Sequence, residues 1–319
     1  MMETLLGEVG RRLSDRWLIR AVGPGLLWCA VAALAVFLGH ARAFDLVDAV
    51  LRAESAVDVL RARPTLAVLC AVLAVLAAAL SGLAAQAIGA VVRSGWLGLW
   101  PGPGRRFAAR LAAGRRARAV RRLAADRKVL PVVYLPDRPT WMGDRVRLTD
   151  VRVNAQYGLR LALIWPRLWL LLDADTRAMV YDARDRFERA GTLAGWAVLY
   201  LALAPWWWPA LPLGLGLAGY AWWRGRQGAG LYADTVEATV DLFHPRLAES
   251  LGHRVEAGRP LDPAVADAVN DQLHKGASAY PQDTATGAVS EKTPYPSGIL
   301  ASDSRERQQR ARPPVSETA

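Results

Sequence analysis

The sequence predicts an all-α membrane protein with four transmembrane helices, arranged as two hairpins, and a helical cytoplasmic module between the hairpins. Three observations support this class. Four apolar runs contain no charged side chain, 53% of the 319 residues are hydrophobic, and basic residues concentrate in the segments on one side of those runs. Because a helix needs about 20 apolar residues to cross roughly 30 Å of hydrocarbon, we take each run as a candidate span.

The first predicted hairpin consists of spans 23–39 and 65–92, joined by an outside loop at 40–64. The second of these spans is the most apolar part of the chain. Small residues recur along it at every fourth position, namely Ala77, Ser81, Ala85 and Gly89. Such a stripe allows another helix to approach closely, either from this chain or from a second copy in a homo-oligomer.

A cleaved signal peptide is the alternative interpretation of the run at 23–39. The sequence HARA at 40–43 resembles a small-residue cleavage site. The charged Arg42 inside that sequence and the long segment before the run favour a retained transmembrane helix. The two cysteines, Cys29 and Cys70, lie in separate spans and predict neither a disulfide framework nor a zinc site.

The second predicted hairpin consists of spans 191–207 and 209–223, both near the lower limit of length for a span. Tryptophans cluster at the expected turn between them, and further aromatic residues precede Arg224 at the far end. Aromatic side chains are enriched at both interfaces of a membrane. Pro205 and Pro209 disfavour one continuous helix, so the pattern predicts a tight hairpin.

The distribution of arginine predicts the orientation, since cytoplasmic segments carry an excess of basic residues. The segments 1–22 and 93–190 are rich in arginine, whereas acidic and basic residues balance in the 40–64 loop. Both termini and the 93–190 module are therefore expected in the cytoplasm, with the chain in the cell inner membrane. Beyond the second hairpin, 225–276 is expected to form cytoplasmic helices and 277–319 a disordered tail.

The 93–190 module begins with the arginine-rich amphipathic segment PGPGRRFAARLAAGRRARAVRRLAADR. One face of this segment carries Arg115, Arg118, Arg121 and Arg122. We expect these arginines to contact anionic lipid headgroups or a protein partner, with a solvated charged face as the alternative. The absence of interleaved aromatic residues argues against nucleic acid as a partner. A bend is expected at Gly114, because the apolar faces before and after it point in different directions.

The apolar run LALIWPRLWLLLD, at 161–173, is not expected to cross the membrane. Arg160 and Arg167 would each cost several kcal/mol at mid-bilayer, and the run between them is too short. Pro166 suits the first turn of a helix, which predicts a helix–turn–helix element here. Trp165, Arg167 and Trp169 are its candidate interface residues, although packing in a core is the favoured role.

Polar residues and glycines predict helix ends elsewhere in the chain. Asp144 is expected to cap a helix that ends before Gly158. Either Asp173 or Asp175 is expected to begin a helix that runs into the third span. Asp262, which precedes a proline, is expected to begin the last helix.

The sequences PTWMGDR, YGL and WPRLWLLL, all within 139–172, resemble a pattern in an uncharacterised family of actinomycete multi-pass membrane proteins, PTxxGDR…YGL…WPRLW. An acidic residue often follows the YGL in that family, where this chain has Arg160. The family has no known activity. The resemblance therefore implies a membrane protein of the same kind and assigns no role to any residue.

Motifs for catalysis, cofactors or metals are not found in the sequence. GLGLAG at 214–219 matches the dinucleotide pattern G-x-G-x-x-G, but it lies in an apolar span with no strand before it, which favours close helix packing. The four histidines lack the spacing of metal ligands. Glu237 and Asp241 are expected on a solvated helix face. The spans contain no Asp, Glu, Lys, Arg or His, which argues against a coupled transporter and leaves a passive pore open.

These observations predict a non-enzymatic membrane protein that acts as an anchor, adaptor or sensor through its cytoplasmic helical module. A small oligomeric channel or transport component is one alternative, and a membrane-tethered nucleic-acid binder is another. The expected partners are anionic lipid headgroups, an unidentified protein and a second copy of the chain. No cofactor is expected.

Overall fold

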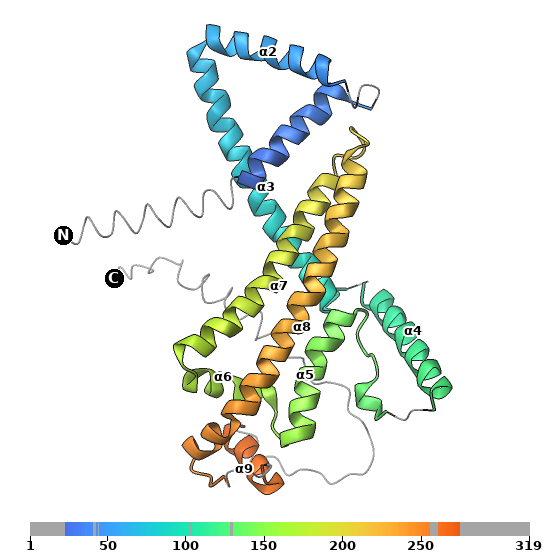
Figure 1. Cartoon of the computed structure of the whole chain (residues 1–319), viewed down its shortest axis with the longest axis vertical. Coiled ribbons are helices and arrows are strands. Elements are labelled where there is room, and N and C mark those ends of the chain that lie inside the picture. The colour runs from blue at the N-terminus through green and yellow to red at the C-terminus, as the bar shows by residue number, and fades with distance from the viewer. Residues whose placement is uncertain are drawn as a thin grey trace, which may run out of the picture. The chain divides into compact units, whose positions relative to one another are not determined.

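The computed structural model describes residues 23–40, 43, 45–102, 104–127, 130–255 and 261–274. Within these ranges the chain is helical and contains no strand (Figure 1), which confirms the predicted all-α class. The predictions for the N-terminal segment 1–22 and for a disordered tail at 277–319 concern residues outside the described ranges.

Helices with short connections make up the described chain. They are a helix at Gly23–Leu38, α2 (Leu46–Ala62), α3 (Pro64–Trp96), α4 (Gly104–Ala125), the 3₁₀ turn η1 (Val132–Tyr134), α5 (Trp141–Tyr157), α6 (Leu161–Leu171), α7 (Ala174–Leu201), α8 (Ala210–Ser250) and α9 (Pro263–Leu273). The chain divides into two compact units, whose boundaries fall within α5 and α8. The first unit takes the described residues up to Arg152 and Leu172–Phe243, and the second takes Val153–Leu171 and those from His244 onward.

Among the described residues, α3 is the one helix that is long and apolar enough to cross a membrane. It has 33 residues, with no charged side chain before Arg93, and a length of about 50 Å. The helix Gly23–Leu38 and α6 are also apolar but shorter. α3 therefore indicates association with a membrane, whereas length and composition do not establish the four predicted spans.

The two segments of the second predicted hairpin are parts of longer helices. The span 191–207 begins within α7, which ends at Leu201, and 209–223 is the start of α8, which continues to Ser250. A turn separates the two helices, as the tryptophans and prolines predict. The segment 40–64, predicted as an outside loop, is not purely a loop, because it contains α2.

Local capping predictions are confirmed at three helix ends. The carboxylate of Asp173 caps α7 and accepts hydrogen bonds from the hydroxyl and the N–H of Thr176, which lower the pKa of Asp173. Asp262 caps α9 by accepting a bond from the N–H of Ala264. Gly158, with a φ of 69°, ends α5.

Two predictions of interrupted helices are wrong. α6 is a single helix with Pro166 near its middle, so there is no helix–turn–helix element. Burial of Ile164 and Leu168 on one face of α6 outweighs the backbone hydrogen bond that proline removes. α4 continues through Gly114, and no neighbouring element lies within 4 Å of the Cβ position at this glycine to bend the helix. Figure 1 shows α4 as one unbroken helix.

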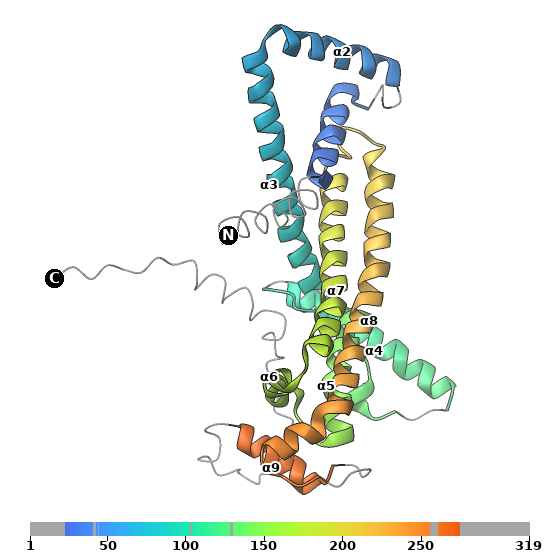
Figure 2. The same ribbon diagram turned by 60° about the vertical axis from the view of Figure 1, so that its left-hand side comes forward.

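The small-residue stripe of α3 packs against α7 in the same chain. Ser81, Ala85 and Gly89 are buried, while Ala77 is exposed. A Cβ atom at Gly89 would lie 2.5 Å from the carbonyl oxygen of Gly191, so the two backbones are in direct contact. Figure 2 shows the two helices side by side along this contact.

Aromatic and small residues form a buried cluster at one end of the α3–α7 contact. Its members are Trp96, Met142, Phe187, Ala190, Ala194, Ala221 and Ala229, from α3, α5, α7 and α8. The ring centroid of Trp96 lies 6.1 Å from that of Phe187 and 5.8 Å from that of Trp222. The three rings therefore connect α3, α7 and α8 at the ends of the charge-free segments of these helices.

The second unit contains a contact between α6 and α9. The buried side-chain amide of Asn270 donates to the carbonyl oxygen of Gly158 at 2.8 Å and accepts from the N–H of Arg160 at 3.1 Å. Both bonds go to the connection between α5 and α6. Asn270 therefore satisfies backbone groups that helix ends leave unpaired.

Replacing Gly195 with alanine should destabilise the α3–α7 contact, because the new Cβ atom would overlap the carbonyl oxygen of Ala85. We expect a cost of about 1–3 kcal/mol, typical of overpacking. Gly216→Ala is the matched control, since nothing lies within 4 Å of its Cβ position and alanine favours helix. Thermal unfolding of the detergent-solubilised chain measures both, and equal midpoints for the two variants would contradict the proposed contact.

Candidate functional site

A buried carboxylate, Asp144, organises the segment between α4 and α5. Its Oδ1 accepts hydrogen bonds from the N–H groups of Asp137 and Arg138, at 2.9 Å and 2.8 Å. Its Oδ2 accepts a bond of 2.6 Å from the guanidinium group of Arg115 on α4. Asp144 therefore fixes the end of the connecting segment and one side of α4 at the same time.

Asp144 does not cap α5, contrary to the prediction. The helix begins three residues earlier, at Trp141, and the hydroxyl oxygen of Thr140 accepts the N–H of Gly143 at 3.0 Å. The hydroxyl of Thr140 also donates to the carbonyl oxygen of Trp96 at the end of α3. Because Thr140 already caps the helix, the carboxylate of Asp144 is free to bond the preceding segment.

Arg147 holds the same segment from the next turn of α5. Its guanidinium group donates to the carbonyl oxygens of Val133 and Leu135, at 3.0 Å and 2.9 Å. The group also lies 3.9 Å from the carboxylate of Asp144. Two side chains of α5 thus fix the backbone that presents Asp137 and Arg138.

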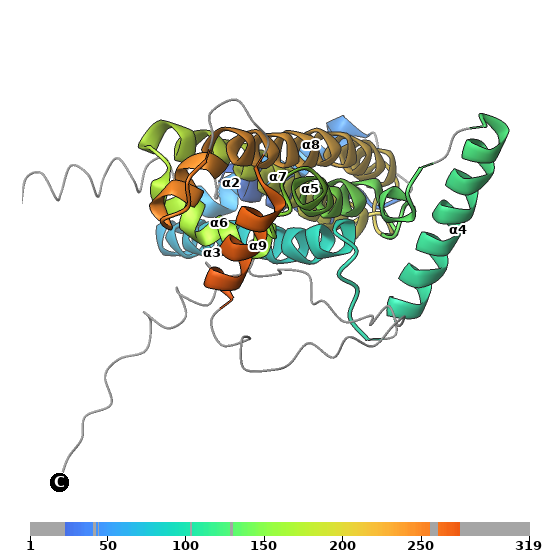
Figure 3. The same ribbon diagram turned by 90° about the horizontal axis from the view of Figure 1, so that it is seen from below.

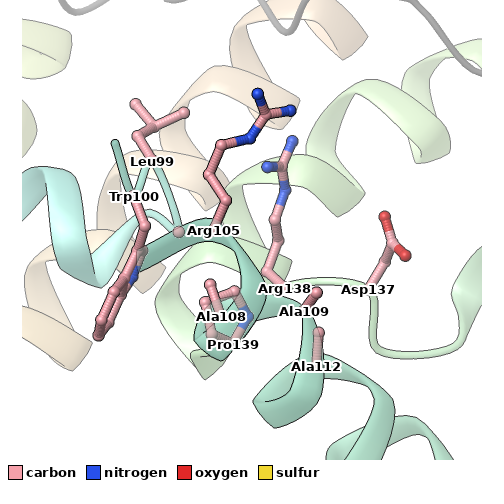
Figure 4. Close-up of a pocket in the computed structure, with 10 residues that line it drawn as sticks. Leu99, Trp100, Arg105, Ala108, Ala109, Ala112, Asp137, Arg138 and Pro139 are labelled. Atoms are coloured by element: carbon pink, nitrogen blue, oxygen red, sulfur yellow. The ribbon is translucent and has the colours of Figure 1, made fainter. Parts of the chain in front are cut away.

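A pocket of about 310 Å³ lies between α4 and this segment. It is lined by Gly98, Leu99, Trp100, Arg105, Ala108, Ala109, Ala112, Asp137, Arg138 and Pro139. Figure 4 shows the side chains of Arg105 and Arg138 extending in the same direction, with the Trp100 ring on one side and the Asp137 carboxylate on the other. Two guanidinium groups suit an anionic group such as a carboxylate or phosphate.

The four candidate arginines of α4 divide into two kinds. Arg115 donates hydrogen bonds to the carboxylate of Asp144 and to the carbonyl oxygen of Arg138, and 22% of its side chain is exposed. Arg118 is exposed and donates to the carbonyl oxygen of Gly114 within its own helix. Arg121 and Arg122 are exposed as well. Figures 1 and 3 show α4 apart from α3, α7 and α8, so its exposed arginines are accessible.

The candidate interface residues of α6 lie in the second unit. Trp165 is buried, and its ring centroid is 5.9 Å from that of Trp169. Arg167 donates to the carbonyl oxygen of Leu163 in the same helix. These contacts place Trp165 in the packed core, in agreement with the favoured interpretation.

Sequence reasoning missed an ionic cluster between α5 and α8. Arg145 donates to Glu237 and Asp234, and Arg152 lies 3.3 Å from Glu237. Burial lowers the pKa of Arg145, but its bonds to the two carboxylates outweigh burial, so the pKa is raised. The expectation of a solvated face is therefore wrong for Glu237, because the sequence does not show that α5 faces this part of α8.

Candidate metal ligands are not brought together in the part of the chain that the structure describes. No group of three or more His, Cys, Asp or Glu side chains there could hold a metal ion. GLGLAG lies inside α8, where Gly214 packs against Leu201. Nothing lies within 4 Å of the Cβ positions at Gly216 and Gly219, so the packing interpretation holds for one glycine of the three.

Comparison with known proteins gives no relative for this chain. No protein-family model, curated protein or solved structure matches it.

Replacing Asp144 with asparagine should loosen the segment beside the pocket, because the charge that faces Arg115 and one acceptor are lost. We expect the free energy of unfolding to fall by about 1.5–3 kcal/mol, typical of hydrogen bonds to charged groups. Amide hydrogen exchange should accelerate at 131–140. Asp137→Asn, at the exposed rim of the same pocket, is the matched control and should change neither quantity. Unchanged exchange in the Asp144 variant would refute the assigned role.

Proposed function

We propose that this chain is a non-enzymatic multi-pass protein of the inner membrane that acts as an adaptor. Its recognition surface consists of the exposed arginines of α4 and the pocket between Arg105 and Arg138, and it binds an acidic segment of a protein partner. The observation that carries the proposal is the fixed position of this surface. Asp144 bonds Arg115 of α4, and Asp144 and Arg147 bond the segment that carries Arg138, shortly after the apolar helix α3.

Exposed apolar side chains support the proposed membrane location. On α3, Leu80, Leu83 and Val91 are each more than half exposed. Leu215 on α8 is 56% exposed, within a stretch that has no charge before Arg224. Soluble proteins rarely expose apolar patches of this extent, whereas the same side chains are stable against lipid.

Contacts at the opposite end of the apolar region support two hairpins that lie against each other. The indole N–H of Trp207 donates to the carbonyl oxygen of Ala43 at 3.1 Å. The ring of His40 bonds the carbonyl oxygen of Trp206 at 2.7 Å. These bonds join the connection after the first helix to the turn between α7 and α8, which is the arrangement that four spans require.

The packing of α3 against α7 removes one reason to expect an oligomeric channel. The stripe of small residues on α3 was a candidate surface for a second copy, and α7 of the same chain covers it at Ala85 and Gly89. An acidic protein partner remains the better match to the arginine surface, because both Arg105 and Arg138 line a concave pocket.

Cysteine labelling in intact cells tests the topology. With Cys29 and Cys70 replaced by serine, Val57→Cys on α2 should react with a membrane-impermeant maleimide. Arg121→Cys on α4 should react only after the membrane is permeabilised. Labelling of position 121 from outside, or of both positions only after permeabilisation, would contradict the four-span arrangement.

Site-specific photo-crosslinking tests the adaptor function. A photoreactive residue at position 121 should give one discrete protein adduct, which disappears when Arg118 and Arg122 are replaced by glutamine. Position 242 on α8 is the control, because Leu242 is also exposed, at 72%, and lies far along the chain from α4. Adducts with lipid alone would assign α4 to the membrane surface, and nuclease-sensitive adducts would support the nucleic-acid alternative. Either result would overturn the proposal.

A further inference from the structure

A second pocket, of about 350 Å³, lies where α3 and α7 leave their charge-free segments. It is lined by Gln86 and Arg93 of α3 and by Glu188, Arg189, Thr192, Leu193 and Trp196 of α7. Neither the α4 surface nor the Asp144 contacts include these residues. In the proposed topology, the pocket opens at the cytoplasmic face of the membrane.

Arg93 is fixed at the wall of this pocket. Its guanidinium group donates to the carbonyl oxygen of Glu188 at 3.2 Å. The absence of a side chain at Gly191 makes room for Arg93, since a Cβ atom there would overlap the side-chain carbons of the arginine. The close contact between α3 and α7 therefore determines where the guanidinium group of Arg93 lies.

The charge of the pocket favours an anion. Arg93 and Arg189 contribute two guanidinium groups, and Glu188 contributes one carboxylate. Oε1 of Glu188 already accepts a bond of 2.8 Å from Arg184, which offsets its negative charge. Arg189 lies 3.5 Å from the carboxylate of Asp182, which is itself paired with Arg186 at 2.7 Å. The lining side chains of the pocket therefore carry one more positive than negative charge.

Polarity changes along the pocket in the same order as along a phospholipid. Gln86 precedes Arg93 by seven residues, or about 10 Å along α3, and Trp196 follows Arg189 by the same interval on α7. Because the two helices are antiparallel, both cations lie at one end and the uncharged polar groups lie deeper. Beyond Gln86, the exposed side chain of Leu83 begins the apolar surface of α3.

We propose that this pocket binds the headgroup of an anionic phospholipid of the cytoplasmic leaflet. Arg93 and Arg189 bind the phosphate. Thr192, Gln86 and the indole of Trp196 lie at the depth of the glycerol-ester oxygens, and the acyl chains follow the apolar face of α3. Basic pockets between transmembrane helices are suited to such lipids. This inference rests on the proposed membrane topology and does not require the α4 surface.

Lipid retention by the full chain tests the site. The chain is reconstituted in nanodiscs that contain equal amounts of phosphatidylglycerol and phosphatidylcholine, and the lipid that stays bound on release is identified by native mass spectrometry. The wild-type chain should retain phosphatidylglycerol selectively. Arg189→Gln should weaken retention about fivefold, which corresponds to roughly 1 kcal/mol for one arginine near the membrane surface.

Arg224→Gln is the matched control, because this exposed arginine follows the charge-free start of α8 and does not line the pocket. Its retention of phosphatidylglycerol should equal that of the wild type. Since Arg93→Gln also removes a bond to the backbone, Gln86→Leu serves as the second pocket variant and should likewise reduce retention.

Three results would overturn the proposal. Equal losses in the Arg189 and Arg224 variants would indicate diffuse positive charge. Equal retention of phosphatidylcholine and phosphatidylglycerol would show no preference for an anion. Displacement of the lipid by excess inorganic phosphate would indicate a site for free phosphate. All three are distinguishable from a wrong topology, which cysteine labelling reports independently.

Discussion

The direct contact between the backbones of α3 and α7 positions the rest of the first unit. Gly89, Gly191 and Gly195 lie where a side chain would overlap the other helix, so the helices approach more closely than larger residues allow. This approach brings Arg93 to the carbonyl oxygen of Glu188 and Trp96 to the ring of Phe187. In lipid, where burial of apolar surface gives little drive for helices to associate, packing of this kind and interhelical hydrogen bonds supply the stability.

The arginines of this chain look alike in the sequence but have different surroundings in the fold. Arg115 and Arg147 bond a buried carboxylate or backbone carbonyl oxygens and hold a segment in place. Arg145 joins α5 to α8 through two carboxylates. Arg118, Arg121 and Arg122 on α4 remain exposed, whereas Arg93 lines a pocket beside α7. Net charge alone therefore overstates the basic surface that is open to a partner.

Predictions from the sequence succeeded where the deciding residues lie within a few positions of one another. Asp173 and Asp262 cap their helices through N–H groups two or three residues away, and Gly158 ends α5 through its own backbone conformation. The predictions failed where a distant contact decides. Pro166 is tolerated inside α6 because one face of that helix is buried, and Asp144 turns away from the helix start because Arg115, 29 residues earlier, lies against it.

Composition and periodicity were sufficient to predict the all-α class of the described residues and the long apolar helix α3, because helix formation depends on spacing within a turn or two. They predicted four spans, of which α3 alone among the described helices has the length and composition to cross a membrane. The stripe on α3 was equally visible as a surface for a neighbouring helix. Which helix occupies it depends on contacts between residues about a hundred positions apart in the chain, and which arginines stay exposed depends on contacts such as that of Arg115 with Asp144. A periodic pattern marks the face of a helix that packs, but the identity of the neighbour depends on the shape and charge of both surfaces once the chain is folded.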